Sequence, residues 1–163
     1  MYTDRIEHVM QQWMRERPDR DYRPMGILGR ILLIAERLQK DVDGMSKGYD
    51  IPTGGFDVLA TLQRNGSPYR MSPTELYREL VLPSGSLTHR LDRLEQAGMV
   101  ARHPDPDDRR AQIVELTQRG AEAINGAMDD HLENEELLLH RLTPEEQEQA
   151  AALLAKILAV ANR

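Results

Sequence analysis

Two adjacent arginines, Arg109 and Arg110, end an acidic, proline-containing stretch, HPDPDDRR, at residues 103–110. A solvated turn needs no such pair, so the charge of these side chains indicates a binding role. Guanidinium groups bind phosphate oxygens in pairs of hydrogen bonds, and they enter narrow minor grooves, where the negative potential is concentrated. The pair therefore points to contact with nucleic acid. The alternative is a turn in which the neighbouring aspartates neutralise both arginines.

Residues 84–97 carry a second set of side chains that suits the same chemistry. At helical spacing Leu87, Leu91 and Leu94 share one face, and small or hydrogen-bonding residues lie opposite. Glycine and serine let a helix approach a duplex closely, N–H groups at a helix start bind phosphate, and His and Arg reach base edges in the major groove. Taken alone, this face would rather indicate a solvated helix surface. The candidate DNA-binding residues are Ser84, Gly85, Ser86, Thr88, His89, Arg93, Arg109 and Arg110.

The elements on both sides of this segment decide between the two interpretations. The sequence SPTE at residues 72–75 combines a capping box with proline at the first helical position, and it predicts a short helix ending near Val81. The next helix covers residues 84–97, with Gly98 as its C-cap. The runs MVARH and AQIVEL read as strands of a β-hairpin joined by PDPDDRR. This order predicts a winged helix-turn-helix, a DNA-binding fold.

Amphipathic helices are expected elsewhere in the chain, with Thr3 as the cap of the first, while the RNGSPYRM stretch at residues 64–71 is expected to form a loop. The terminal helices are too apolar to stand alone in water, which suggests a dimer interface. The predicted fold is mainly α with a small β-hairpin, in one domain. The expected helices cover residues 3–17, 25–45, 53–64, 117–139 and 143–160. The winged helix-turn-helix lobe is residues 53–116, and the flanking N- and C-terminal dimerisation regions are residues 1–48 and 117–163.

The composition narrows the class of protein. Lysine and arginine total 21 against 27 acids, a net charge of −6, which argues against a nonspecific nucleic-acid binder. Cysteine is absent, so disulfides and thiolate chemistry are excluded. There is no apolar run long enough for a membrane span and no signal-peptide pattern at the start, so a soluble cytoplasmic protein is expected.

The motifs in the sequence do not indicate an enzyme. The five histidines show no ligand spacing with carboxylates, and neither a nucleophile motif nor a phosphate-cradling glycine loop is present. We predict that the chain is not an enzyme and uses no cofactor or metal. Two alternatives stay open: a metal-responsive regulator, if histidines and acids cluster between lobes, and a dimeric adapter that does not bind DNA.

The segment LTHRLDRLEQAGMVARHPDPDDRRAQIVELTQRG resembles the signature of the MarR family of winged helix-turn-helix regulators. It contains a recognition helix, a strand, an Asp-x-Arg wing, a second strand, and an LT-x-x-G start of the next helix. The resemblance extends over the whole chain. It implies a homodimeric, ligand-responsive transcriptional regulator that binds double-stranded DNA at a pseudo-palindromic operator.

The chain also resembles the urate-responsive PecS/HucR branch of that family. The branch has an extra N-terminal helix with a Trp, an Asp in FDVLA, an Arg in the recognition helix and an Arg early in the wing. The text YRMSPTEL before the short helix is typical of it as well. By this resemblance the candidate ligand-binding residues are Trp13, Asp57, Arg90 and Arg102.

The chemistry of these residues suits a flat, weakly acidic purine. Trp13 offers a π-face, and Arg90 and Arg102 offer cations for an anionic edge. Arg90 lies on the flank of the leucine face, where a half-buried guanidinium needs a partner, and Asp57 is the candidate. The alternatives are packing alone for Trp13, a purely structural Asp57–Arg90 pair, and a DNA-phosphate contact for Arg102.

The expected function is that of a repressor released by a small anionic aromatic ligand such as urate or another purine. A metal- or phenolic-acid-responsive regulator on the same scaffold is the alternative.

Overall fold

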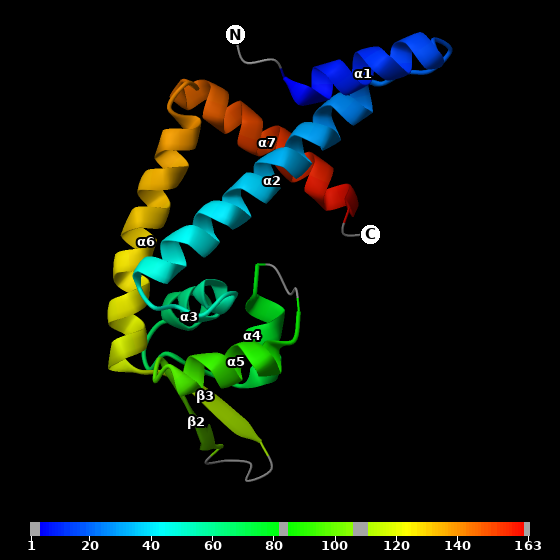
Figure 1. The fold of residues 1–163 in the computed structure, drawn as a ribbon. Helices are drawn as coiled ribbons and strands as arrows, with labels where there is room; N and C mark the ends of the chain where they lie inside the picture. Colours follow the sequence, from blue (N-terminus) through cyan, green and yellow to red (C-terminus); the bar gives the residue numbers. More distant parts are fainter. Residues whose placement is uncertain (1–3, 82–84, 106–110, 162–163) are drawn as a thin grey trace. The chain divides into compact units, whose positions relative to one another are not determined.

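The computed structural model describes residues 4–81, 85–105 and 111–161, and these form seven helices and three strands (Figure 1). Backbone contacts divide the chain into two compact units, Met1–Gly44 and Met45–Arg163. The predicted mainly helical fold with a small antiparallel sheet is confirmed. None of the described helices is both long and apolar enough to cross a membrane.

The first unit contains α1 (Arg5–Glu16) and most of α2 (Arg23–Gly48), which pack together at two glycines. A Cβ atom at Gly26 would lie 2.7 Å from the Met10 sulfur, and one at Gly29 would lie 2.9 Å from Ile6 Cδ1. A side chain at either position would force the end of the Met10 or Ile6 side chain to shift. The glycines therefore let the two helices approach closely, and the apolar stripe of α1 rests on them.

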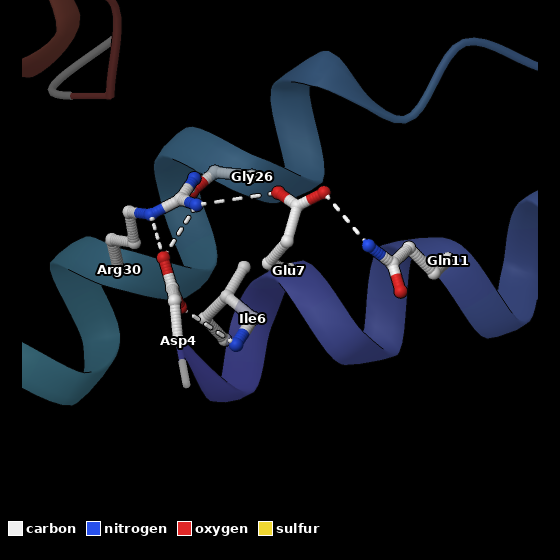
Figure 2. Close-up of polar contacts among 6 residues, drawn as sticks. All are labelled: Asp4, Ile6, Glu7, Gln11, Gly26 and Arg30. Atoms are coloured by element: carbon white, nitrogen blue, oxygen red, sulfur yellow. Dashed lines mark hydrogen bonds and ion pairs between the residues drawn. The ribbon is translucent and has the colours of Figure 1, made fainter. Parts of the chain in front are cut away.

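A polar cluster fixes the start of α1 on α2 (Figure 2). Arg30 Nε donates to Asp4 Oδ2 at 2.6 Å, and its Nη1 donates to the Gly26 carbonyl at 2.8 Å. Asp4 also accepts from the backbone N–H of Ile6 at 2.9 Å, so it is the N-cap of α1. The prediction that Thr3 caps this helix is therefore wrong, and Thr3 itself lies outside the described residues. The loss of hydration raises the pKa of the Asp4 carboxyl. The hydrogen bond and charge of Arg30 and the hydrogen bonds from backbone N–H groups lower it by more, so the pKa lies below its ordinary value.

The second unit holds the expected helix-turn-helix and wing. Figure 1 shows α3, α4 and α5 gathered beside the β2–β3 hairpin. Its elements in chain order are α3 (Gly55–Arg64), β1 (Arg70–Met71), α4 (Pro73–Glu79), α5 (Leu87–Gln96), β2 (Val100–Pro104), β3 (Gln112–Leu116), α6 (Gln118–Leu139) and α7 (Pro144–Ala161).

The sheet has three antiparallel strands in the order β1-β3-β2, one more than the predicted hairpin. The expectation of a loop over residues 64–71 is wrong at its end, because Arg70 pairs with Glu115 and Met71 with Val114. Met71 is buried, and the Leu116 N–H donates to the Tyr69 carbonyl at 3.1 Å. Two residues are too few to show the alternation of apolar and polar side chains that predicts a strand from sequence. This strand forms because it pairs with β3.

The core of the second unit lies where its helices meet the sheet. Helices α3, α4, α5 and α6 and strand β3 each contribute a side chain with less than 2% of its surface exposed, so the lobe is held by packing rather than by propensity alone. These include Leu59 and Leu62 of α3, Leu76 of α4, Leu94 of α5, Val114 of β3 and Ile124 of α6.

The junction between the wing and α6 gives a stability prediction. A Cβ atom at Gly120 would lie 2.1 Å from the Met99 carbonyl oxygen, a backbone atom that cannot rotate away. We expect Gly120→Ala to lower the free energy of unfolding by about 1–3 kcal/mol through overpacking. Gly44→Ala is the matched control, because no atom lies within 4 Å of its Cβ position. Urea unfolding checks both, and an unchanged midpoint for Gly120→Ala would contradict the close packing.

Candidate DNA-binding and effector sites

Helix α5 presents the polar surface that was expected of a DNA-reading helix. Leu91 and Leu94 are buried, while Thr88, His89 and Arg93 are exposed on the other side. Arg93 Nε donates to the His89 carbonyl at 3.3 Å. The division into a buried apolar face and an exposed polar face is the arrangement in which a helix enters the major groove.

The start of α5 differs from the prediction. The helix begins at Leu87 rather than at Ser84, and Ser86 is the N-cap, accepting from the His89 N–H at 3.5 Å. Gly85 has a φ of +76°, a left-handed conformation that an α-helix cannot include. Gly85 and Ser86 are exposed just ahead of the helix, and Ser84 lies outside the described residues.

The wing is formed by β2 and β3, and its two arginines lie beyond the described part. Arg109 and Arg110 belong to residues 106–110, outside the described residues. The strands on both sides are well paired, and the Asp105 N–H donates to the Ala111 carbonyl at 3.0 Å. The structure thus describes the hairpin on both sides of the arginine pair.

A buried arginine joins α5 to the start of α3. The Arg90 side chain has 8% of its surface exposed, so it is more deeply buried than the sequence indicated. Its Nε donates to the Gly54 carbonyl at 2.6 Å, and its Nη2 lies 3.5 Å from Asp57 Oδ2. The predicted proximity of Asp57 and Arg90 is therefore present in the structure as an ion pair.

The Asp57 carboxylate is incompletely satisfied. Its Oδ2 atom is buried and has no hydrogen-bond partner among the described residues, because the contact with Arg90 is long. A buried carboxylate oxygen without a hydrogen bond is costly. A ligand N–H group could supply the missing hydrogen bond.

Arg102 lies among different partners. It is on β2, its side chain has 18% of its surface exposed, and its Nη2 contacts the Asp92 carboxylate. Its Nε lies 3.4 Å from Glu95 Oε2. Asp92 and Glu95 both belong to α5, and sequence reasoning missed them. Their spacing of three residues on one helix was the available signal.

Trp13 lies in the first unit and stacks on Tyr22. The ring centroids are 6.4 Å apart, with 22° between the planes, and 47% of the Trp13 surface is exposed. The Tyr22 hydroxyl donates to the Arg17 carbonyl at 3.0 Å, which fixes the tyrosine ring. The indole thus keeps an accessible aromatic surface.

Within the described ranges, no three His, Asp or Glu side chains come together in a group that could hold a metal ion.

Comparisons with known proteins agree with this arrangement. The model of the MarR family matches residues 49–111. The chain is 38% identical to the transcriptional regulator PecS of Dickeya dadantii (strain 3937) over 152 residues, 93% of this chain and 92% of PecS. A mutant E. coli MarR complexed with operator DNA superposes with a TM-score of 0.71 at 28% identity, covering 84% of this chain and 97% of MarR. A putative MarR-like regulator from Bacillus cereus ATCC 10987 gives 0.74 at 24% identity, covering 85% and 98%.

A winged helix-turn-helix with an exposed polar α5 defines a DNA-binding transcriptional regulator. The chain belongs to the MarR family, and it is similar to PecS over nearly its whole length. The family resemblance inferred from the sequence is thereby confirmed, as is the prediction that the chain is a regulator and not an enzyme.

Proposed function

We propose that this regulator is a homodimeric repressor that a small anionic aromatic ligand, with urate as the leading candidate, releases from its operator. The observation that carries the proposal is the buried Asp57–Arg90 connection between α3 and α5, in a chain 38% identical to PecS. A ligand that changes this connection acts directly on the helix that reads DNA.

The DNA contacts are assigned to α5 and the wing. α5 enters the major groove, where His89 and Arg93 reach base edges or phosphates. The residues ahead of the helix allow close approach, and the wing arginines follow the adjacent backbone or minor groove. The full set is Ser84, Gly85, Ser86, Thr88, His89, Arg93, Arg109 and Arg110.

The effector contacts are assigned to Trp13, Asp57 and Arg90. The indole stacks on the purine, Arg90 pairs with its anionic edge, and Asp57 either accepts a ring N–H or is repelled. In either case Arg90 exchanges its ion pair with Asp57 for a contact with the ligand, and α5 shifts. The ligand must bind the DNA-free state more tightly, because equal affinity for both states shifts nothing. Arg102, the fourth residue of the resemblance, is already engaged by two carboxylates.

The dimer is assigned to the terminal helical regions, residues 1–48 and 117–163. None of the described residues of α1 or α7 is buried within the chain. Large apolar side chains are exposed on both regions, and patches of this kind mark protein–protein contacts. They include Ile27, Leu28, Leu32 and Ile34 of α2, and Leu153, Leu154, Leu158 and Val160 of α7.

A charge on α7 tests the dimer. We expect Leu153→Glu to produce a monomer at micromolar concentration and to abolish tight operator binding, because paired half-sites about 10 bp apart need two recognition helices. Gln149→Glu adds the same charge at an exposed polar position of the same helix and is expected to stay dimeric. Analytical ultracentrifugation measures both variants. A wild-type protein that sediments as a monomer would contradict the dimer.

A ligand screen tests the effector class. The purified protein is heated with urate, xanthine, neutral purines, phenolic acids and divalent metals in turn. We expect urate to raise the unfolding temperature, since a ligand that binds the folded state stabilises it. Stabilisation by phenolic acids or metals alone would favour the alternative regulators.

A further inference from the structure

An ion-pair cluster connects the wing to α5 outside the proposed effector contacts. Arg102 of β2 places its guanidinium between Asp92 and Glu95, two carboxylates one turn apart on α5. The arginine side chain is mostly buried, with 18% of its surface exposed, while the two acids have 42% and 45% exposed. We call these three residues the wing clamp.

The wing clamp joins α5 and β2, which are already connected by a hydrogen bond at the junction between them. The Met99 N–H donates to the Leu94 carbonyl at 2.9 Å where α5 leads into β2. Further along, Arg102 stands opposite Val114, a buried residue of the central strand β3. Arg102 is therefore held by the sheet, and its guanidinium gives α5 a second attachment that restricts its rotation about the first.

The charges of the wing clamp also bear on DNA. Asp92 is next to Arg93, which the proposed function places on the duplex. Carboxylates so close to phosphates are repelled unless a cation neutralises them. Asp92 accepts a hydrogen bond from Arg102 Nη2, while the buried Arg102 Nε has the 3.4 Å ion pair with Glu95 and no hydrogen-bond partner among the described residues.

We propose that Asp92, Glu95 and Arg102 are positioning residues for operator recognition, holding α5 against the wing so that His89 and Arg93 meet the base edges in register. The inference rests on the proposed placement of α5 on DNA. It gives Arg102 a role different from the direct ligand contact that the resemblance implies, and it assigns a function to two acids on a DNA-facing helix.

The direction in which one substitution changes operator affinity distinguishes the wing clamp from simple electrostatic repulsion. Asp92→Asn removes a negative charge near the duplex, so repulsion alone would make this variant bind DNA more tightly. The wing clamp requires the opposite: without the ion pair Arg102 and α5 are freed, and the operator dissociation constant rises by about tenfold. Affinity for an unrelated duplex does not fall.

The test measures dissociation constants for operator and unrelated duplex across a salt series. Arg102→Ala is expected to weaken operator binding by about tenfold with an unchanged salt slope, since no phosphate contact is removed. Arg102→Lys restores most of the affinity. The double variant Asp92→Asn with Arg102→Ala binds no more weakly than Arg102→Ala alone, because both changes break the same ion pair.

Two control variants separate the possible failures. Arg70→Ala removes an arginine from its ion pair with Glu115, outside α5 and the dimerisation regions, and it is expected to leave operator affinity unchanged. Arg93→Ala is expected to lower both the affinity and the salt slope. If Arg93→Ala has no effect, α5 is not the reading helix, and the proposed function fails rather than the wing clamp alone.

Three results would overturn the wing clamp while Arg93→Ala behaves as expected. One is tighter operator binding by Asp92→Asn. Another is a salt slope that falls by about 0.9 in Arg102→Ala, the mark of a direct phosphate contact made by Arg102. The last is unchanged operator affinity for Arg102→Ala together with an abolished response to urate, which would make Arg102 a ligand residue.

Discussion

Replacing Arg93 by alanine is expected to weaken operator binding by about 1–3 kcal/mol, and removing Arg109 and Arg110 together is expected to cost at least as much. Arg93 is exposed on the polar face of α5, and the arginine pair lies in the sequence between β2 and β3, outside the described residues. Fewer counterions are released when a phosphate contact is removed, so the salt slope falls by about 0.9 per phosphate. Fluorescence anisotropy with labelled operator, over a range of salt concentrations, measures both quantities.

The contacts made by α5 and those made by the wing arginines are expected to differ in specificity. A base-edge contact from α5 discriminates between sequences, whereas removing a phosphate contact weakens binding to every sequence alike. His89→Ala should therefore change the base preference at one operator position, and the wing variants should not. If Arg109 and Arg110 can both be removed with unchanged affinity, the wing is only a neutralised turn.

Breaking the Asp57–Arg90 pair is expected to change both stability and regulation. Arg90→Ala removes a buried cation and leaves Asp57 without its ion pair, which costs on the order of 3 kcal/mol of unfolding free energy. Asp57→Asn keeps the shape of the side chain and should cost less, because Asp57 is partly exposed. Chemical denaturation of both variants measures this difference.

The same variants are expected to lose the response to urate. Ligand coupling of about 1–3 kcal/mol corresponds to roughly a 5- to 150-fold rise in the operator dissociation constant of the wild type. Asp57→Asn should bind operator in the absence of ligand and show little of this rise. Arg70→Ala is the control that retains it. A full urate response in Asp57→Asn would place the effector site elsewhere.

Much of the DNA-binding lobe could be predicted from local patterns. Leucines at helical spacing marked the buried face of α5, and the capping box at Ser72 and Glu75 is present, with the Glu75 N–H donating to Ser72 Oγ at 3.2 Å. Thr143 and Glu146 form the second expected capping pair. These features depend on residues within one turn of each other, so the sequence displays them directly.

The features that were missed depend on contacts between distant residues. Strand β1 exists because Met71 meets Val114, far along the chain. α5 starts three residues later than expected because Gly85 adopts a left-handed conformation, which composition alone does not reveal. The ion pairs of Arg102 with Asp92 and Glu95 were not foreseen, because the position of β2 beside these two acids is a property of the folded lobe.

An anionic aromatic ligand is expected to detach this regulator from DNA, and a urate titration of the wild-type protein–operator complex tests this most directly. We expect urate to release the operator and to quench Trp13, the chain's one tryptophan, over the same concentration range. Adenine, a neutral purine of similar shape, should do neither. An operator complex that stays intact in millimolar urate and xanthine would contradict the account.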